Sequence, residues 1–266
     1  MTVFNIFALD KNNPDQINLF NSKADGRLDL GKVADKMVEF TSPILDDGMV
    51  DGEEFLKINI THLNETTVLE AFATGQGSLG YYTQAYYRND EEVNSKRKQQ
   101  RFFSKAKIFL LETNYLIVVF EDTTEEKIKS SVKKLVESLG FELSNFRLSD
   151  VLMRSIRSTY TWNEVRLEKV DNDQDSTKKV HYEIDVADGE NESLIDSIYK
   201  DQGKMVQLSF EMPSKSIEGA PNFISVRLYR NDHRIVINNK EFPNAETLYK
   251  FIIHLSNKLI ELEKDQ

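Results

Sequence analysis

Hydrophobic and polar residues alternate in short runs along the chain, and the clearest pattern spans Ala106–Gly140. Ile108–Leu111 and Tyr115–Phe120 are apolar runs rich in β-branched and aromatic residues, and Asn114 between them suits a left-handed turn. The second run is apolar on both faces, as in a strand that is covered on two sides. The pattern therefore predicts a β-hairpin whose second strand is central in its sheet.

The residues after this hairpin predict an amphipathic helix. Asp122 with Glu125 and Thr123 with Glu126 form two overlapping capping boxes. Apolar residues follow at helical spacing, and Gly140 stands where a left-handed residue commonly ends a helix.

The same order of elements recurs near the end of the chain. Phe223–Tyr229 and Arg234–Ile237 predict a hairpin, and a long amphipathic helix follows it. The predicted fold class is α+β, with mostly antiparallel sheets and amphipathic helices packed on one face. We expect two lobes, 1–150 and 151–266, each with a hairpin followed by a helix, and a boundary within Leu148–Thr159. A single continuous sheet is the alternative.

Several shorter elements complete the prediction. A helix is expected over Gly31–Phe40, and Tyr160–Val170 should pair with Val180–Val186 as a hairpin. A short helix over Glu192–Lys200 is expected to turn four apolar or aromatic side chains inward, namely Leu194, Ile195, Ile198 and Tyr199.

The composition of the chain excludes several kinds of site and segment. With 0 Cys among 266 residues, the chain can form neither a disulfide nor a thiolate zinc site. The first residues lack the features of a signal peptide, and no apolar run approaches the ~20 residues of a membrane span. We therefore expect a cytoplasmic protein that does not associate with membranes. The net charge of -10 opposes nucleic-acid binding unless basic residues cluster locally.

Gly75, Gly77 and Gly80 match the G-x-G-x-x-G pattern of dinucleotide-binding folds. The tyrosine-rich continuation is poor helix material, so a flexible turn is favoured over a nucleotide site. Further along, alternating aspartates resemble the start of a calcium loop, but Ser176 and Tyr182 replace the diagnostic Gly and Glu. The four histidines form no ligand pair. No catalytic residue, cofactor or metal is predicted.

One segment, 95–107, carries six basic residues and no acid. Lys and Arg side chains can neutralise phosphates, and nearby aromatic rings can stack on bases. A second basic and aromatic stretch, 147–166, could line the same groove. The residues predicted to bind nucleic acid are Lys96, Arg97, Lys98, Arg101, Lys105, Lys107, Tyr86, Tyr87, Trp162, Arg154 and Arg157.

The same segment could equally have a structural or protein-binding role. The acids at 90–92 could pair with the lysines, and Phe102 and Phe103 could enter the core. A solvated loop or a protein-binding face has the same composition.

The sequence thus favours a non-enzymatic binding protein that engages nucleic acid without base-specific motifs. A composition typical of AT-rich genomes suggests an accessory factor of a bacterial mobile-element or phage-defence (antiviral) system. Two alternatives stay open: an interaction subunit that binds a protein partner or forms a homo-oligomer, and an enzyme whose active site is assembled from distant residues.

Overall fold

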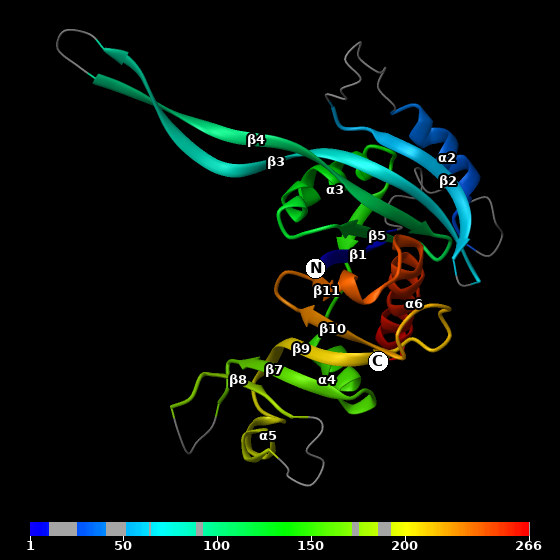
Figure 1. Ribbon diagram of the computed structural model, residues 1–266, viewed down its shortest axis with the longest axis vertical. Coiled ribbons are helices and arrows are strands. Elements are labelled where there is room, and N and C mark those ends of the chain that lie inside the picture. The colour runs from blue at the N-terminus through cyan, green and yellow to red at the C-terminus, as the bar shows by residue number, and fades with distance from the viewer. Residues whose placement is uncertain are drawn as a thin grey trace. The chain divides into compact units, whose positions relative to one another are not determined.

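The computed structural model describes residues 1–10, 26–40, 52–63, 65–88, 93–171, 176–185 and 193–265. These residues form an α+β fold with eleven strands, all antiparallel, which confirms the predicted fold class (Figure 1). The chain divides into two compact units. We call residues 9–61 and 68–143 the arm unit, and residues 1–8, 62–67 and 144–266 the C-terminal unit. Most of the first strand and residues 62–67 thus group with the second half of the chain.

The arm unit contains four strands in the order β2-β3-β4-β5, together with helices α2 and α3 and the 3-10 helix η1. Their bounds are α2 Leu30–Val38, β2 Phe55–Leu63, β3 Thr66–Arg88, β4 Val93–Leu111, β5 Tyr115–Phe120, η1 Glu125–Ile128 and α3 Lys129–Glu137.

The hairpin and helix predicted over 106–140 form, with the difference that the helix begins as the 3-10 helix η1 and becomes α-helical only at Lys129. Asn114 adopts φ 67 in the turn between β4 and β5, and Gly140 adopts φ 107 after α3. Asp122 Oδ1 accepts the Glu125 N–H at 3.0 Å, while Glu125 Oε2 accepts the Glu121 N–H at 2.9 Å. The Glu125 carboxylate thus accepts from the residue before Asp122 and not from Asp122 itself, so the contact only approximates a capping box, while Asp122 satisfies a backbone donor at the start of η1.

The C-terminal unit contains strands in the order β1-β11-β10-β9-β7-β8, with β6 paired to β1. The bounds are β1 Thr2–Asp10, β6 Glu142–Asn145, α4 Asp150–Thr159, β7 Trp162–Glu168, β8 Lys179–Glu183, α5 Leu194–Tyr199, β9 Lys204–Pro213, β10 Phe223–Tyr229, β11 Arg234–Ile237, η2 Asn239–Glu241 and α6 Ala245–Lys264.

Over β7, β9 and β10, one face of this sheet is covered by helices and the other is polar. Along β10, Ile224, Val226 and Leu228 are buried, and the residues between them are exposed or half-buried. α4 packs on β9 and contacts α6, so these two helices supply the cover. On the opposite face Glu164 accepts hydrogen bonds from the Gln207 amide and the Ser209 hydroxyl. The alternation follows from the period-2 geometry of a strand.

The prediction for the short helix over 192–200 is wrong in one respect. α5 forms, but Leu194, Ile195 and Ile198 are 80%, 46% and 51% exposed. The helix is held instead by polar contacts, since Asp196 accepts hydrogen bonds from Arg157 and Tyr182. Helical periodicity identified an apolar face but could not show whether another element covers it.

Candidate nucleic-acid interface

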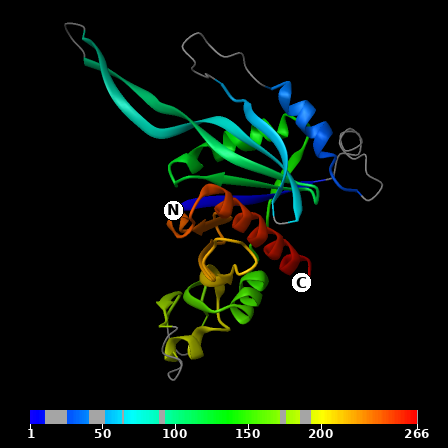
Figure 2. The same cartoon turned by 45° about the vertical axis from the view of Figure 1, so that its right-hand side comes forward.

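The basic segment lies on a long, two-stranded β-ribbon. β3 and β4 pair from Val68 and Leu111 outward to Arg88 and Val93. We call Ser78–Arg88 and Val93–Arg101 the arm, which begins at the Ser78–Arg101 pair. Figures 1 and 2 show the arm extending beyond the other helices and strands of its unit. At ~3.3 Å per residue, the part of β4 that lies in the arm, from Arg101 to Val93, runs for roughly 26 Å.

Gly75, Gly77 and Gly80 form neither a turn nor a nucleotide loop, because they lie within continuous strand β3. A Cβ atom at Gly75 would lie 2.8 Å from the Cβ of Ser131, and one at Gly77 would lie 2.6 Å from Phe102 Cζ. The Ser131 hydroxyl donates to the carbonyl of Gln76 at 2.9 Å. Glycine is therefore needed here so that α3 and the Phe102 ring can lie directly on the strand.

Gly80 has a different role. The register shifts between Ser78 and Gly80, which marks a β-bulge, and Gly80 adopts φ 107. Bulges bend a strand and increase its twist, so the bulge separates the packed base of the ribbon from the free arm.

Five basic side chains of β4, four in the arm and Lys105 at its base, face two directions. Because successive side chains alternate, Arg97 and Arg101 lie on one face with Lys105 at the base, while Lys96 and Lys98 lie on the other. All five side chains are exposed. Neither strand contains Asp or Glu anywhere in 71–88 or 93–107.

Three of the five cations contact neutral groups. The Arg97 guanidinium lies 4.6 Å from the centre of the Tyr81 ring, and Arg101 donates to Gln99 and to Gln76. The Lys105 ammonium lies 5.2 Å from the centre of a phenylalanine ring at the base of the ribbon. Within the described part of the chain, none of the five forms an ion pair with a carboxylate. The acids at 90–92 lie outside the described residues.

Lys107, the last cation in the segment, is used within the fold. Its ammonium is 2.7 Å from a Glu70 carboxylate oxygen, and its side chain is only 10% exposed. It also lies 4.7 Å from the centre of the Phe72 ring. Lys107 is therefore a poor candidate for contacting phosphate.

The second predicted stretch lies in the C-terminal unit, and its arginines hold that unit together. Arg157 pairs with Asp196 at 2.6 Å and lies over the Trp162 ring at 4.6 Å. Arg154 pairs with Asp150 at 2.8 Å and donates to the Gly203 carbonyl. These contacts tie α4 to α5 and to the start of β9, so both arginines and the tryptophan have structural partners.

The aromatic residues near the basic segment differ from the prediction in their exposure. The side chains of Tyr86 and Tyr87 lie outside the described residues. Tyr81 and Tyr82 are 61% and 48% exposed, and Phe103 is 47% exposed instead of entering the core. The missed signal was strand alternation: Phe102 and Phe103 are adjacent, so only one of them can face α3.

No protein-family model matches the chain, and a search of curated proteins finds no match either. Among the described residues, no cluster of three or more His, Cys, Asp or Glu is arranged to hold a metal ion. No helix in the same residues has the length and apolar character needed to cross a membrane.

Proposed function

We propose that the protein binds duplex nucleic acid by placing the arm in a groove, with phosphates contacted by Lys96, Arg97, Lys98, Arg101 and Lys105. One observation carries this proposal: an exposed β-ribbon bears five cations that make no ion pair with a described carboxylate. Closely spaced cations repel one another, and an anionic partner removes that repulsion.

The shape of the arm favours a duplex. The major groove of B-DNA admits a two-stranded β-ribbon. The roughly 26 Å of arm, from ~3.3 Å per residue, is about three quarters of one helical turn of about 34 Å. Cations on both faces of the ribbon could then reach the backbones on both sides of the groove.

The available chemistry favours binding without sequence preference. Amide side chains can read adenine in the major groove; Gln76 and Gln99 already accept hydrogen bonds from Arg101, which leaves the exposed Gln84 and Gln100 as the amides able to contact bases. The Tyr81 ring is covered by Arg97, which leaves it less free to stack on a base. Phosphate contacts therefore supply most of the expected affinity.

The salt dependence of binding tests this proposal quantitatively. If five phosphates are neutralised, log K against log salt should have a slope of about -4.5 for duplex DNA. Affinity should then fall roughly 500-fold between about 50 and 200 mM salt. Replacing Lys96, Arg97 and Lys98 together by Ala should reduce the slope to about -1.8 and the loss to roughly 12-fold.

A matched control replaces three exposed lysines outside the arm, Lys127, Lys134 and Lys240, by Ala. This variant removes the same net charge and should keep the wild-type slope. The proposal fails if both triple variants lose affinity equally, because binding would then reflect net charge alone. Tighter binding to single strands than to duplex would exclude the groove geometry.

A protein-binding role is the second candidate, and α5 favours it. Leu194, Ile195 and Ile198 form an exposed apolar surface on one short helix, and clustered apolar side chains of this kind are common at protein interfaces. Light scattering of the wild type and of an Ile198→Glu variant tests for self-association. A smaller assembly in the variant would support this role.

A further inference from the structure

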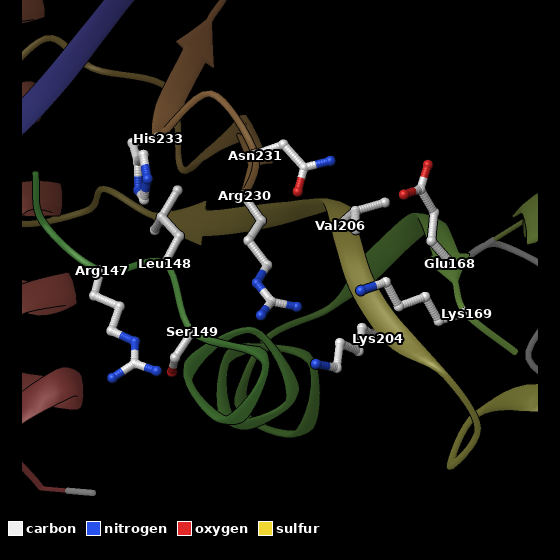
Figure 3. Close-up of a pocket in the computed structure, with 10 residues that line it drawn as sticks. All are labelled: Arg147, Leu148, Ser149, Glu168, Lys169, Lys204, Val206, Arg230, Asn231 and His233. Carbon is white, nitrogen blue, oxygen red and sulfur yellow. The ribbon is translucent and has the colours of Figure 1, made fainter.

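A cavity of about 350 Å³ lies within the C-terminal unit, well away in sequence from the arm. Its walls come from the start of α4, the end of β7, the start of β9 and the turn between β10 and β11 (Figure 3). The lining residues are Arg147, Leu148, Ser149, Glu168, Lys169, Lys204, Val206, Arg230, Asn231 and His233. This volume is within the range of small-molecule sites.

The cavity is strongly basic. In Figure 3 the charged ends of Lys169, Lys204 and Arg230 point toward one another, whereas Arg147 points away. Within the described part of the chain, none of these three converging cations forms an ion pair. The one acid in the lining, Glu168, points away from them and already accepts from Arg166 and Lys179.

A close approach between neighbouring strands brings these cations together. Gly203 adopts φ 65, and a Cβ there would lie 2.7 Å from the Glu168 carbonyl oxygen, so β9 approaches the end of β7 closely. Lys204 consequently lies opposite Glu168 in the sheet and beside Lys169. Arg230 follows β10, on the other side of β9 from β7, and it is held beside β9 because its N–H donates to the Val206 carbonyl at 3.0 Å.

Lys169 itself has a left-handed backbone, with φ 55. This conformation favours Gly or Asn, and other residues adopt it at an energetic cost. A strained backbone that is retained often marks a binding site, where the side chain is needed. The start of α4, where Ser149 caps the helix, adds the positive end of a helix dipole to the same wall.

We propose that this cavity binds a phosphate group, with Lys169, Lys204 and Arg230 as its ligands. Three converging cations match the charge of a phosphate or pyrophosphate, and Arg can donate two parallel hydrogen bonds to its oxygens. The group could belong to a small phosphorylated molecule or to a nucleic-acid backbone, because both present the same chemistry. The inference does not depend on the function proposed for the arm.

Calorimetric titration of the full chain with pyrophosphate tests the site. Lys204→Ala and Arg230→Ala should each weaken binding at least tenfold. Lys240→Ala, which removes an exposed lysine outside the cavity, should leave it within twofold. Absence of binding to the wild type, or equal binding by all three variants, would overturn the proposal.

Lys169→Gly separates a binding role from a structural one. Glycine relieves the left-handed backbone, so the melting temperature should stay the same or rise, while pyrophosphate affinity falls. If affinity is unchanged in a folded Lys169→Gly protein, Lys169 is not a ligand and the proposed site is wrong.

Two further titrations identify the source of the phosphate. Tighter binding of adenosine monophosphate than of pyrophosphate would indicate a small phosphorylated ligand. Displacement of pyrophosphate by duplex DNA that persists when Lys96, Arg97 and Lys98 are replaced by Ala would indicate a backbone phosphate.

Discussion

The packing of α3 on β3 can be tested by adding one methyl group at Gly75. Its Cβ would lie 2.8 Å from the Ser131 Cβ, whereas non-bonded carbons are separated by about 3.5–4.0 Å. The helix and strand would have to separate by about 0.7–1.2 Å, taking those contact distances as the target. Such movement strains the hydrogen bond from Ser131 to Gln76, which is 2.9 Å long.

Overpacking of this kind typically costs about 1–3 kcal/mol. The backbone at Gly75 is not left-handed, so steric contact is the only penalty for Gly75→Ala. We expect the free energy of unfolding, measured by urea denaturation, to fall by that amount. Thermal melting should fall by about 2–4 °C per kcal/mol.

A double-mutant cycle identifies the cause. Ser131→Gly removes the clashing Cβ, although alone it costs about 1–2 kcal/mol because glycine is a poor helix former and the hydrogen bond from Ser131 to Gln76 is lost. Gly75→Ala should therefore be less harmful in the Ser131→Gly background, by roughly 1–2 kcal/mol of coupling. Gly31→Ala, in the first turn of α2, is the control: its Cβ would meet only Asp29 Oδ1 at 3.3 Å. The reasoning is refuted if Gly75→Ala is as stable as Gly31→Ala, or if the cycle shows no coupling.

Three further predictions concern stability. Burial raises the pKa of the Glu164 carboxyl, but hydrogen bonds from His181 and Ser209 help to lower it by more, so the net pKa lies below its ordinary value. Its contribution to stability is therefore present at neutral pH and lost as pH falls through the folded-state pKa, and Glu164→Gln should show a shallower loss of melting temperature in acid. Asn114→Val should destabilise by about 1–3 kcal/mol in urea denaturation because valine disfavours the left-handed turn, whereas Asn114→Gly keeps the turn and should cost only the hydrogen bond from Asn114 to the Gly26 carbonyl, about 0.5–1.5 kcal/mol. Leu194→Ser should change the free energy of unfolding by less than about 0.5 kcal/mol, since that side chain is 80% exposed; a larger loss would show that another segment covers α5.

The sequence alone determined the elements whose signals are local. The hairpin and helix over 106–140 depend on a turn residue, a capping box and apolar periodicity, all within a few residues of one another. The same signals located α6, whose cap Asn244 accepts the Thr247 N–H at 2.9 Å. The basic segment could also be identified from the sequence, because its charged residues can be counted without knowledge of the structure.

Only the tertiary structure decided how distant segments are used. Gly75 and Gly77 resemble a turn by propensity, yet packing against α3 keeps them in a strand, and tertiary contacts outweigh local preference. Arg157 resembles a free cation until Asp196, far along the chain, pairs with it. The basic cavity could not be predicted, since Lys204 and Arg230 meet through strand pairing alone. Local patterns specify backbone elements, whereas the charges that remain available for a ligand depend on which partners the fold brings near.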